Sequence, residues 1–190
     1  MEPKTLLVTG FMPFGPNAVN PSWEAVDALP ARIGAVRIET LLLPVEFGAA
    51  AALAGRKAIG IRADAVLCVG LAANRTEVTP EAIGINLRDA SIPDNAGRQP
   101  HNEPVVPDGP AAYFSTLPAR EMTEAIRSAG IPAALSYTAG TYVCNDLLYT
   151  LLHRFAGTSV RAGFIHVPAV SEKVSLNDMT LALIAAISAI

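Results

Sequence analysis

Short apolar runs alternate along the chain with segments of helical period. Residues 65–70 are apolar throughout, which is typical of a strand buried on both faces of a sheet. Residues 36–43 alternate between apolar and polar positions and stop at Pro44, so they predict another strand. Further strands are predicted at residues 5–10, 83–87, 133–137 and 163–167. Helices are predicted at residues 23–29, 48–61, 120–129, 145–155 and 176–190.

This alternation of strands and helices indicates an α/β protein. Strands that are separated by helices usually pair in parallel, and the helices then cover both faces of the sheet. We therefore expect a three-layer α/β/α sandwich with a mostly parallel, twisted central sheet. No linker, internal repeat or low-complexity segment divides the sequence, so we expect one domain over residues 1–190.

Two local signals refine this picture. Ser22 stands just before the first helical segment and is predicted to be its N-cap, since serine is a favoured capping residue. Residues 93–118 hold six of the fifteen prolines, together with turn signals around Asp94 and Asp108. A stretch of this kind inside a compact domain predicts a functional or interface loop.

The composition is that of a chain with a buried core and without a nucleic-acid surface. Hydrophobic residues make up 51% and charged residues 16%, with a mean hydropathy of +0.37, which excludes a disordered chain. Fourteen basic and seventeen acidic residues give a formal net charge of −3, with no run of like charge. No nucleic-acid partner is therefore expected.

A cytoplasmic location without a membrane partner is expected. The apolar segment 179–190 is shorter than the roughly 20 residues that a membrane-spanning helix needs, and we expect it to pack in the core or at a subunit contact. The apolar run after Lys4 is too short for a signal peptide. The chain has two cysteines, far apart in the sequence, so a disulfide framework is not expected and a reducing compartment fits.

Cys144 is the first candidate for chemistry. It follows a predicted strand and the turn at residues 138–141, at the start of a predicted helix. A thiol at a helix N-terminus lies near the positive end of the backbone dipole, which favours the nucleophilic thiolate. The alternative is a small buried hydrophobe, as most free cysteines are. For Cys68, which lies inside an apolar strand, that alternative is the favoured interpretation.

Among the three histidines, His166 is the best candidate for a base. It interrupts an apolar strand, where a polar ring needs a partner, so it is either a satisfied core histidine or a positioned one. His101 lies in the polar, proline-rich loop, where we expect it to be solvated. His153 stands at the end of a helix, where a cation suits the backbone dipole.

Glu81 is the preferred carboxylate to orient such a histidine, because it stands just before an apolar strand. Asp89 and Asp94 are rivals by residue type, although both stand in loop-like sequence. No metal is expected, since no Cys-x-x-Cys or His-x-x-x-His spacing occurs. The glycines after the first strand lack the third glycine and the immediate helix of a dinucleotide-binding turn, so no nicotinamide cofactor is expected either.

Several motifs in a fixed order resemble those of one known family. They are Gly10-Phe11-Met12-Pro13-Phe14-Gly15 with Asn20-Pro21-Ser22, Thr79-Pro80-Glu81, Ile92-Pro93-Asp94-Asn95, the segment from Ser136 to Asn145, and Gly163-Phe164-Ile165-His166-Val167-Pro168. Over about residues 5–170 the chain resembles pyroglutamyl peptidase I, also called pyrrolidone carboxyl peptidase. Several long motifs in the right order are far more specific than any one of them.

The resemblance implies a cysteine peptidase that removes an N-terminal pyroglutamyl residue from peptides. Its triad falls on Cys144 as nucleophile, His166 as acid and base, and Glu81 as orienting group. It also implies no cofactor, a cytoplasmic setting and often a homotetramer, although a dimer is also considered. The residues expected to bind the substrate are Phe11, Phe14, Leu71, Arg75, Ile92, Tyr142 and Val143.

Two positions depart from the family pattern. Ser91 stands where many relatives carry an arginine that contributes to the site, and Leu71 stands where bacterial relatives often have glutamine. Arg88 is close to Ser91 in sequence, but three residues along a strand it would face the other side. Ser91 leaves open the alternative of a catalytically weak or inactive domain that binds small molecules or pyroglutamyl peptides. A second alternative is a nucleoside phosphorylase-like enzyme, because that broad fold is shared. The second lacks a cluster of arginines and glycines for phosphate.

Overall fold

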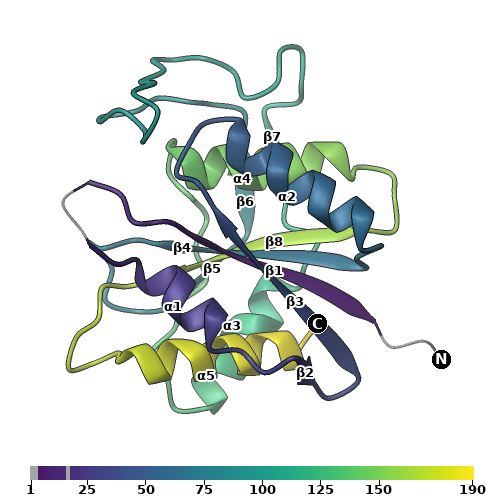
Figure 1. Cartoon of the computed structure of the whole chain (residues 1–190), viewed down its shortest axis with the longest axis vertical. Coiled ribbons are helices and arrows are strands. Elements are labelled where there is room, and N and C mark those ends of the chain that lie inside the picture. Colours follow the sequence, from purple (N-terminus) through teal and green to yellow (C-terminus); the bar gives the residue numbers. More distant parts are fainter. Residues whose placement is uncertain (1–3, 16–17) are drawn as a thin grey trace.

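A computed structural model describes residues 4–15 and 18–190. Residues 1–3 and 16–17 of the expected domain 1–190 lie outside the described residues. A six-stranded sheet in the order β2-β3-β1-β4-β8-β5 forms the centre of the molecule (Figure 1). Its strands are β1 (Thr5–Phe11), β2 (Arg32–Ile33), β3 (Val36–Leu43), β4 (Ala65–Leu71), β5 (Thr79–Glu81) and β8 (Arg161–Val167).

The central strands of this sheet are parallel and its two edge strands are antiparallel. β1 pairs in parallel with β3 and β4, and β4 pairs in parallel with β8. The short strands β2 and β5 run antiparallel to β3 and β8. The prediction of a mostly parallel central sheet is therefore confirmed.

Helices cover both faces of the sheet, as expected for a three-layer sandwich (Figure 1). One face carries α1 (Pro21–Asp27), α3 (Ala119–Ser128) and α5 (Leu176–Ser188), and the other carries α2 (Ala49–Gly60) and α4 (Val143–Arg154). Successive strand residues point to opposite faces. Leu67 and Val69 of β4 accordingly pack in the α1–α3–α5 core, while Val66 and Cys68 pack in the α2–α4 core. The five predicted helices are confirmed.

The strand predicted at residues 133–137 is wrong. This segment makes only isolated bridges to the chain around β5, Val78 with Ala133 and Glu81 with Ser136. The backbone of Ala134 donates to the Val78 carbonyl and that of Ser136 to the Pro80 carbonyl. Pro80 has no N–H to return, so a continuous ladder cannot form.

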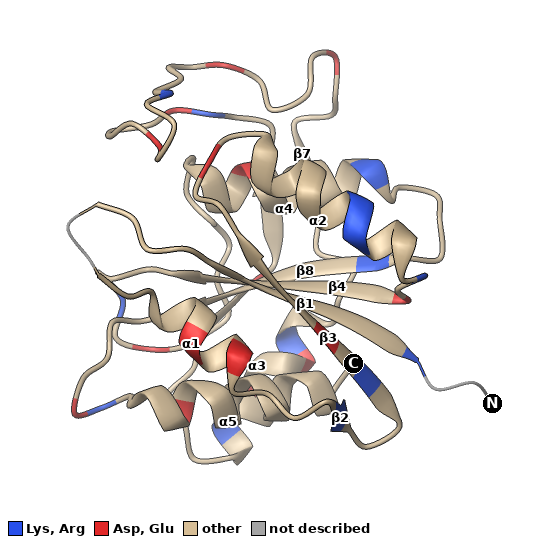
Figure 2. Ribbon diagram, viewed as in Figure 1, with Lys and Arg blue, Asp and Glu red and all other residues tan. Residues whose placement is uncertain are grey.

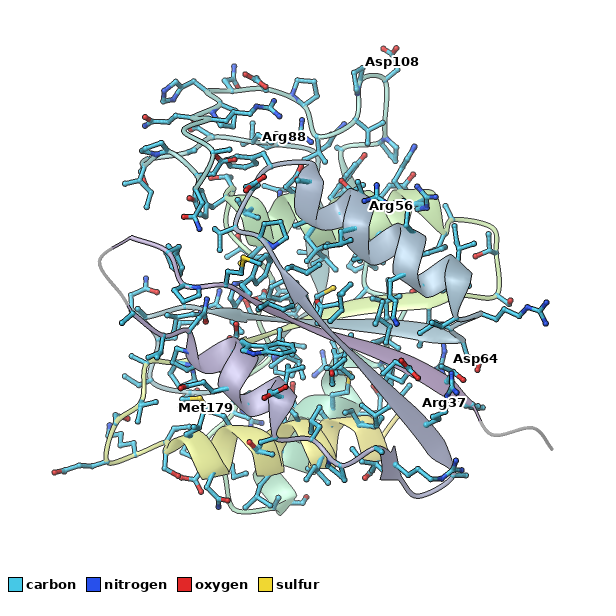
Figure 3. The ribbon with its side chains drawn as sticks, in the orientation of Figure 1. Arg37, Arg56, Asp64, Arg88, Asp108 and Met179 are labelled. Atoms are coloured by element: carbon cyan, nitrogen blue, oxygen red, sulfur yellow. The ribbon has the colours of Figure 1, made fainter. Side chains whose placement is uncertain are left out.

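The segment predicted as a strand at residues 83–87 lies outside the central sheet. Only β6 (Ile83–Ile85) is a strand, and it pairs antiparallel with β7 (Ala112–Phe114) in a separate two-stranded sheet beside α4. Between them, residues 86–111 form a long loop that leaves the three layers, with Asp108 near its outer end (Figures 1 and 3). This loop contains most of the proline-rich stretch.

The N-cap of α1 is Asn20, so the prediction of Ser22 is wrong. The Asn20 Oδ1 atom accepts hydrogen bonds from the Ser22 backbone N–H at 3.1 Å and from its hydroxyl at 2.8 Å. Pro21 occupies the first helical turn, where its missing N–H costs nothing, and the cap lies two residues before the predicted one. The Asn20 Nδ2 atom donates to the Met12 carbonyl at 3.0 Å, which ties α1 to the end of β1.

The start of α4 is clamped to residues 85–88. The Asn145 side chain accepts from the Ile85 N–H and donates to the Ile85 and Leu87 carbonyls at 2.9–3.0 Å. The Arg88 Nε atom donates to Asp146 Oδ1 at 2.6 Å, and Asp146 Oδ2 accepts from the Gly48 N–H before α2. These bonds fix the first turn of α4 against two other segments.

Charged side chains of both signs are scattered over the elements (Figure 2). Among the residues that the structure describes, no helix is both long and apolar enough to span a bilayer.

We predict that Arg88→Met lowers the free energy of unfolding by about 3 kcal/mol, because it leaves the fully buried Asp146 carboxylate without its cation. Urea unfolding followed by circular dichroism measures this change. Arg37→Met is the matched control, since its ion pair with Glu39 is largely exposed and contributes little. Equal losses in the two variants would contradict the assignment of a buried clamp.

Candidate active site

Cys144 is the second residue of α4, and it lies where the helix leaves an extended segment. Its neighbour Tyr142 is the N-cap with extended backbone, and the first helical hydrogen bond runs from the Asp146 N–H to the Tyr142 carbonyl. The backbone N–H of Cys144 therefore precedes the hydrogen-bonded part of the helix and is available to a ligand. Cys144 as a whole residue is partly exposed.

His166 and Glu81 meet because β5 runs antiparallel to β8. The register pairs Thr79 with His166, and the Glu81 carboxylate accepts a hydrogen bond from His166 Nδ1 at 2.7 Å. Glu81 is fully buried and His166 is 4% exposed. Since a carboxylate only accepts, Nδ1 carries the proton and Nε2 is left with its lone pair. The Phe164 ring packs against the imidazole with 4.7 Å between the ring centroids.

The Cys144 sulfur and the backbone of His166 both lie next to Gly70 of β4. The β4–β8 register pairs Gly70 with His166. A Cβ atom on Gly70 would lie 2.9 Å from Cys144 Sγ and 2.7 Å from the Phe164 ring. Glycine at this position therefore leaves room for the Cys144 thiol of α4 to pack against β4, next to the position of His166 on β8.

Arg75 lies behind Glu81 rather than in the expected substrate pocket. Its Nη1 atom donates to Glu81 Oε1 at 2.6 Å and also contacts the Thr79 hydroxyl, while Nη2 donates to the Thr138 carbonyl at 2.9 Å. One carboxylate oxygen thus accepts from both Arg75 and His166. Arg75 provides the positive charge that a buried carboxylate needs and holds Glu81 in place for the histidine.

Burial controls the proton on each member of the Cys144–His166 pair. It raises the pKa of the Cys144 thiol to about 12, and the nearby Glu81 charge raises it further, against the opposite effect of Arg75. Burial also lowers the pKa of His166, although the bond to Glu81 opposes this. The backbone N–H at the helix start lowers the pKa of the thiol, as expected, but desolvation outweighs this effect. At neutral pH the Cys144 thiol and the His166 imidazole are therefore both uncharged.

An apolar hollow opens beside the sulfur, with about 290 Å³ of space when the open solvent at its mouth is included. Five of the residues expected to bind the substrate line it together with Cys144: Phe11, Phe14, Leu71, Tyr142 and Val143. Asn20 and Val45 line it as well and were not predicted. Asn20 belongs to one of the motifs that carry the family resemblance, whereas nothing in the local sequence marks Val45.

Ile92 is not among the lining residues of this hollow. It is 47% exposed, on a loop that the Tyr142 hydroxyl holds by donating to the Pro93 carbonyl at 3.0 Å. Ser91 on the same loop is exposed. The Arg88 guanidinium is bound to Asp146.

The remaining candidates lie apart from this centre. Cys68 is buried in the core, and burial raises the pKa of its thiol to about 12. His101 is exposed, as expected, and His153 Nδ1 lies 2.9 Å from the Tyr113 hydroxyl at the far end of α4. The Asp94 carboxylate accepts three backbone N–H bonds, two from Ala96 and Arg98 of its own loop and one from Phe47. Within residues 4–15 and 18–190, no group of three or more His, Cys, Asp or Glu side chains is placed to hold a metal ion.

Comparison with known proteins agrees with this geometry. The family model described as Pyroglutamyl peptidase matches residues 4–189. A pyrrolidone-carboxylate peptidase of Levilactobacillus brevis is 47% identical over 196 residues, covering 97% of this chain and 96% of the relative. One from Escherichia fergusonii is 50% identical over 167 residues, covering 87% and 78%.

Solved structures extend the likeness to the whole fold. The pyroglutamyl peptidase I of Bacillus amyloliquefaciens superposes with a TM-score of 0.94 at 43% identity, covering all of this chain and 95% of that one. The pyrrolidone carboxyl peptidase of Thermococcus litoralis gives 0.92 at 35% identity, covering 98% and 92%. With a family model that matches almost its full length and relatives this similar, the chain belongs to the pyroglutamyl peptidase family.

Proposed function

We propose that this peptidase hydrolyses the bond after an N-terminal pyroglutamyl residue, with Cys144 as nucleophile, His166 as acid and base, and Glu81 as orienting group. The observation that supports it best is the meeting of three elements at one point. A thiol at the start of α4 and a histidine bound to a buried carboxylate both lie at Gly70, beside an apolar hollow. This is the nucleophile, base and orienting group that acyl transfer requires.

The hollow suits a pyroglutamyl ring. The ring is a small neutral lactam without a free amine, so it fits an apolar slot and needs no acidic anchor. Phe11, Phe14, Val45 and Tyr142 supply apolar walls. Leu71 offers no hydrogen bond, so the polar groups of the ring depend on the backbone of the lining segments and on Asn20. Such buried bonds reject a ligand that cannot make them, such as proline.

In the first step the Cys144 sulfur attacks the carbonyl carbon of the scissile amide, outside the lactam ring, while the thiol proton passes to His166 Nε2. Glu81 keeps the imidazole oriented and stabilises the imidazolium that forms, while Arg75 holds the Glu81 carboxylate in place. The backbone N–H of Cys144, at the start of α4, is the natural donor to the oxyanion. The imidazolium then gives its proton to the leaving amine, which leaves a thioester.

In the second step a water molecule replaces the leaving amine. His166 Nε2 removes a proton from the water, and the resulting hydroxyl attacks the thioester carbon. The C–S bond breaks and pyroglutamate leaves. The proton then returns from His166 to the sulfur, so the free thiol is restored and no cofactor is consumed.

The alternative of an inactive binding domain is not favoured, because the relatives that match most of the chain are named as peptidases. Ser91 replaces a side chain outside the Cys144–His166–Glu81 set, so we expect it to affect the rate rather than the reaction. The phosphorylase-like alternative receives no support from these relatives. A single domain over residues 1–190, a homo-oligomer and a cytoplasmic location stay predictions.

We expect the protein to release the amine from a pyroglutamyl anilide and not from the prolyl or glutamyl anilides. Cys144→Ala removes the nucleophile, and His166→Ala removes the base, so each lowers kcat by at least about a thousandfold. Fluorescence of the released amine measures both. Cys68→Ala is the matched control, since its thiol is sealed in the core. Full activity of Cys144→Ala would refute the proposal.

The raised pKa of Cys144 predicts how the thiol reacts with iodoacetamide. Alkylation follows the thiolate fraction, so its rate rises about tenfold per pH unit from neutral pH toward the thiol pKa of about 12. Mass spectrometry of the labelled peptides follows Cys144 against the buried Cys68. A rate that is already constant near neutral pH would indicate a preformed thiolate–imidazolium pair and contradict this account.

A further inference from the structure

A second hollow adjoins the one beside Cys144. It is an open groove with about 600 Å³ of space, open solvent included. Three segments line it: Ala18, Val19, Pro21 and Glu24; Leu71 and Ala73; and Ala169 and Val170. Leu71 lines both hollows, so the groove begins where the proposed pyroglutamyl slot ends. Val19 and Val170 are more than half exposed on its two sides.

The third wall of the groove, Ala169 and Val170, comes soon after His166, the proposed general acid, in the sequence. β8 ends at Val167, whose carbonyl accepts the Ala72 N–H at 2.9 Å, and the chain continues into Ala169 and Val170. In the proposed mechanism His166 protonates the leaving amine, so the peptide beyond the scissile bond must start near His166. A ring held beside Cys144 therefore directs the leaving peptide across Leu71 toward this groove.

The lining gives the groove a defined chemistry. Its described lining residues are apolar apart from one, and Glu24 is the sole ionisable side chain among them. Small alanine side chains leave room, and valine side chains offer contact area. An apolar or basic side chain can lie against these walls with Glu24 nearby, whereas an acidic side chain meets a like charge.

On the basis of the proposed function, we propose that this groove binds the residue that follows pyroglutamate in the substrate. Glu24 makes it selective for basic over acidic side chains at that position. The occupant is thus a segment of the substrate peptide, continuous with the ring in the neighbouring slot.

The test compares kcat/KM for pyroglutamyl-lysine amide and pyroglutamyl-glutamate amide, with the pyroglutamyl anilide as reference. We expect the lysine peptide to be cleaved about fivefold more efficiently, a ratio typical of a partly exposed charge interaction. The ratio falls as ionic strength rises to about 1 M, because the screening length then shrinks to about 3 Å. Pyroglutamate release, followed by chromatography, gives both rates.

Two variants on different walls test the groove itself. Glu24→Gln brings the lysine-to-glutamate ratio close to one, and Val170→Lys on the opposite wall inverts it in favour of glutamate. Asp27→Asn is the matched control, because Asp27 is an exposed acid on the same helix that does not line the groove. It removes the same charge and leaves the ratio unchanged.

The outcomes separate this proposal from the one on which it depends. Cleavage of all three substrates, with a ratio that neither Glu24→Gln nor Val170→Lys changes, overturns the groove and leaves the peptidase activity standing. An equal change with Asp27→Asn also overturns it, since the effect would then come from net charge alone. Cleavage of no pyroglutamyl compound overturns the proposed function and the groove together.

Discussion

The buried hydrogen bond between Glu81 and His166 is the interaction on which the rest of the site depends. It exists because β5 turns back antiparallel at the edge of an otherwise parallel region and pairs with β8. Without that register, the buried Glu81 carboxylate would lack its hydrogen bond to His166. The same edge brings residues 133–138 alongside, where the Thr138 carbonyl helps to bind Arg75. A short strand thus positions the histidine, the carboxylate and its cation together.

Burial has opposite consequences for structure and for reactivity at this point. It makes the Arg75–Glu81–His166 hydrogen bonds strong, since few waters compete for them. It also raises the pKa of Cys144 and lowers that of His166, so both groups rest in their neutral forms. The sulfur therefore becomes a nucleophile only as its proton leaves for the imidazole. The clamp of α4 by Asp146 holds the thiol where that transfer can happen.

Much of this arrangement was predictable from local pattern, and the exceptions have a common cause. The sequence indicates Cys144 because it stands after a turn at the start of a predicted helix, although the strand expected before that turn does not form. The strand expected at residues 133–137 does not form because its partner segment contains Pro80. The residue pattern within 133–137 holds no information about that partner. The family resemblance assigns Arg75 to the substrate, and its contacts with Glu81 and Thr138 leave no trace in the neighbouring residues. Val45 lines the hollow through tertiary packing alone.

The most direct test of the account is to trap the acyl-enzyme. The protein is mixed with excess pyroglutamyl anilide, quenched in acid within the first turnover and digested, and the peptides are analysed by mass spectrometry. The account predicts a pyroglutamyl thioester on the peptide that contains Cys144, formed as the first equivalent of amine appears and removed by hydroxylamine. Amine release without any adduct on Cys144, or an adduct on Cys68 instead, would contradict it.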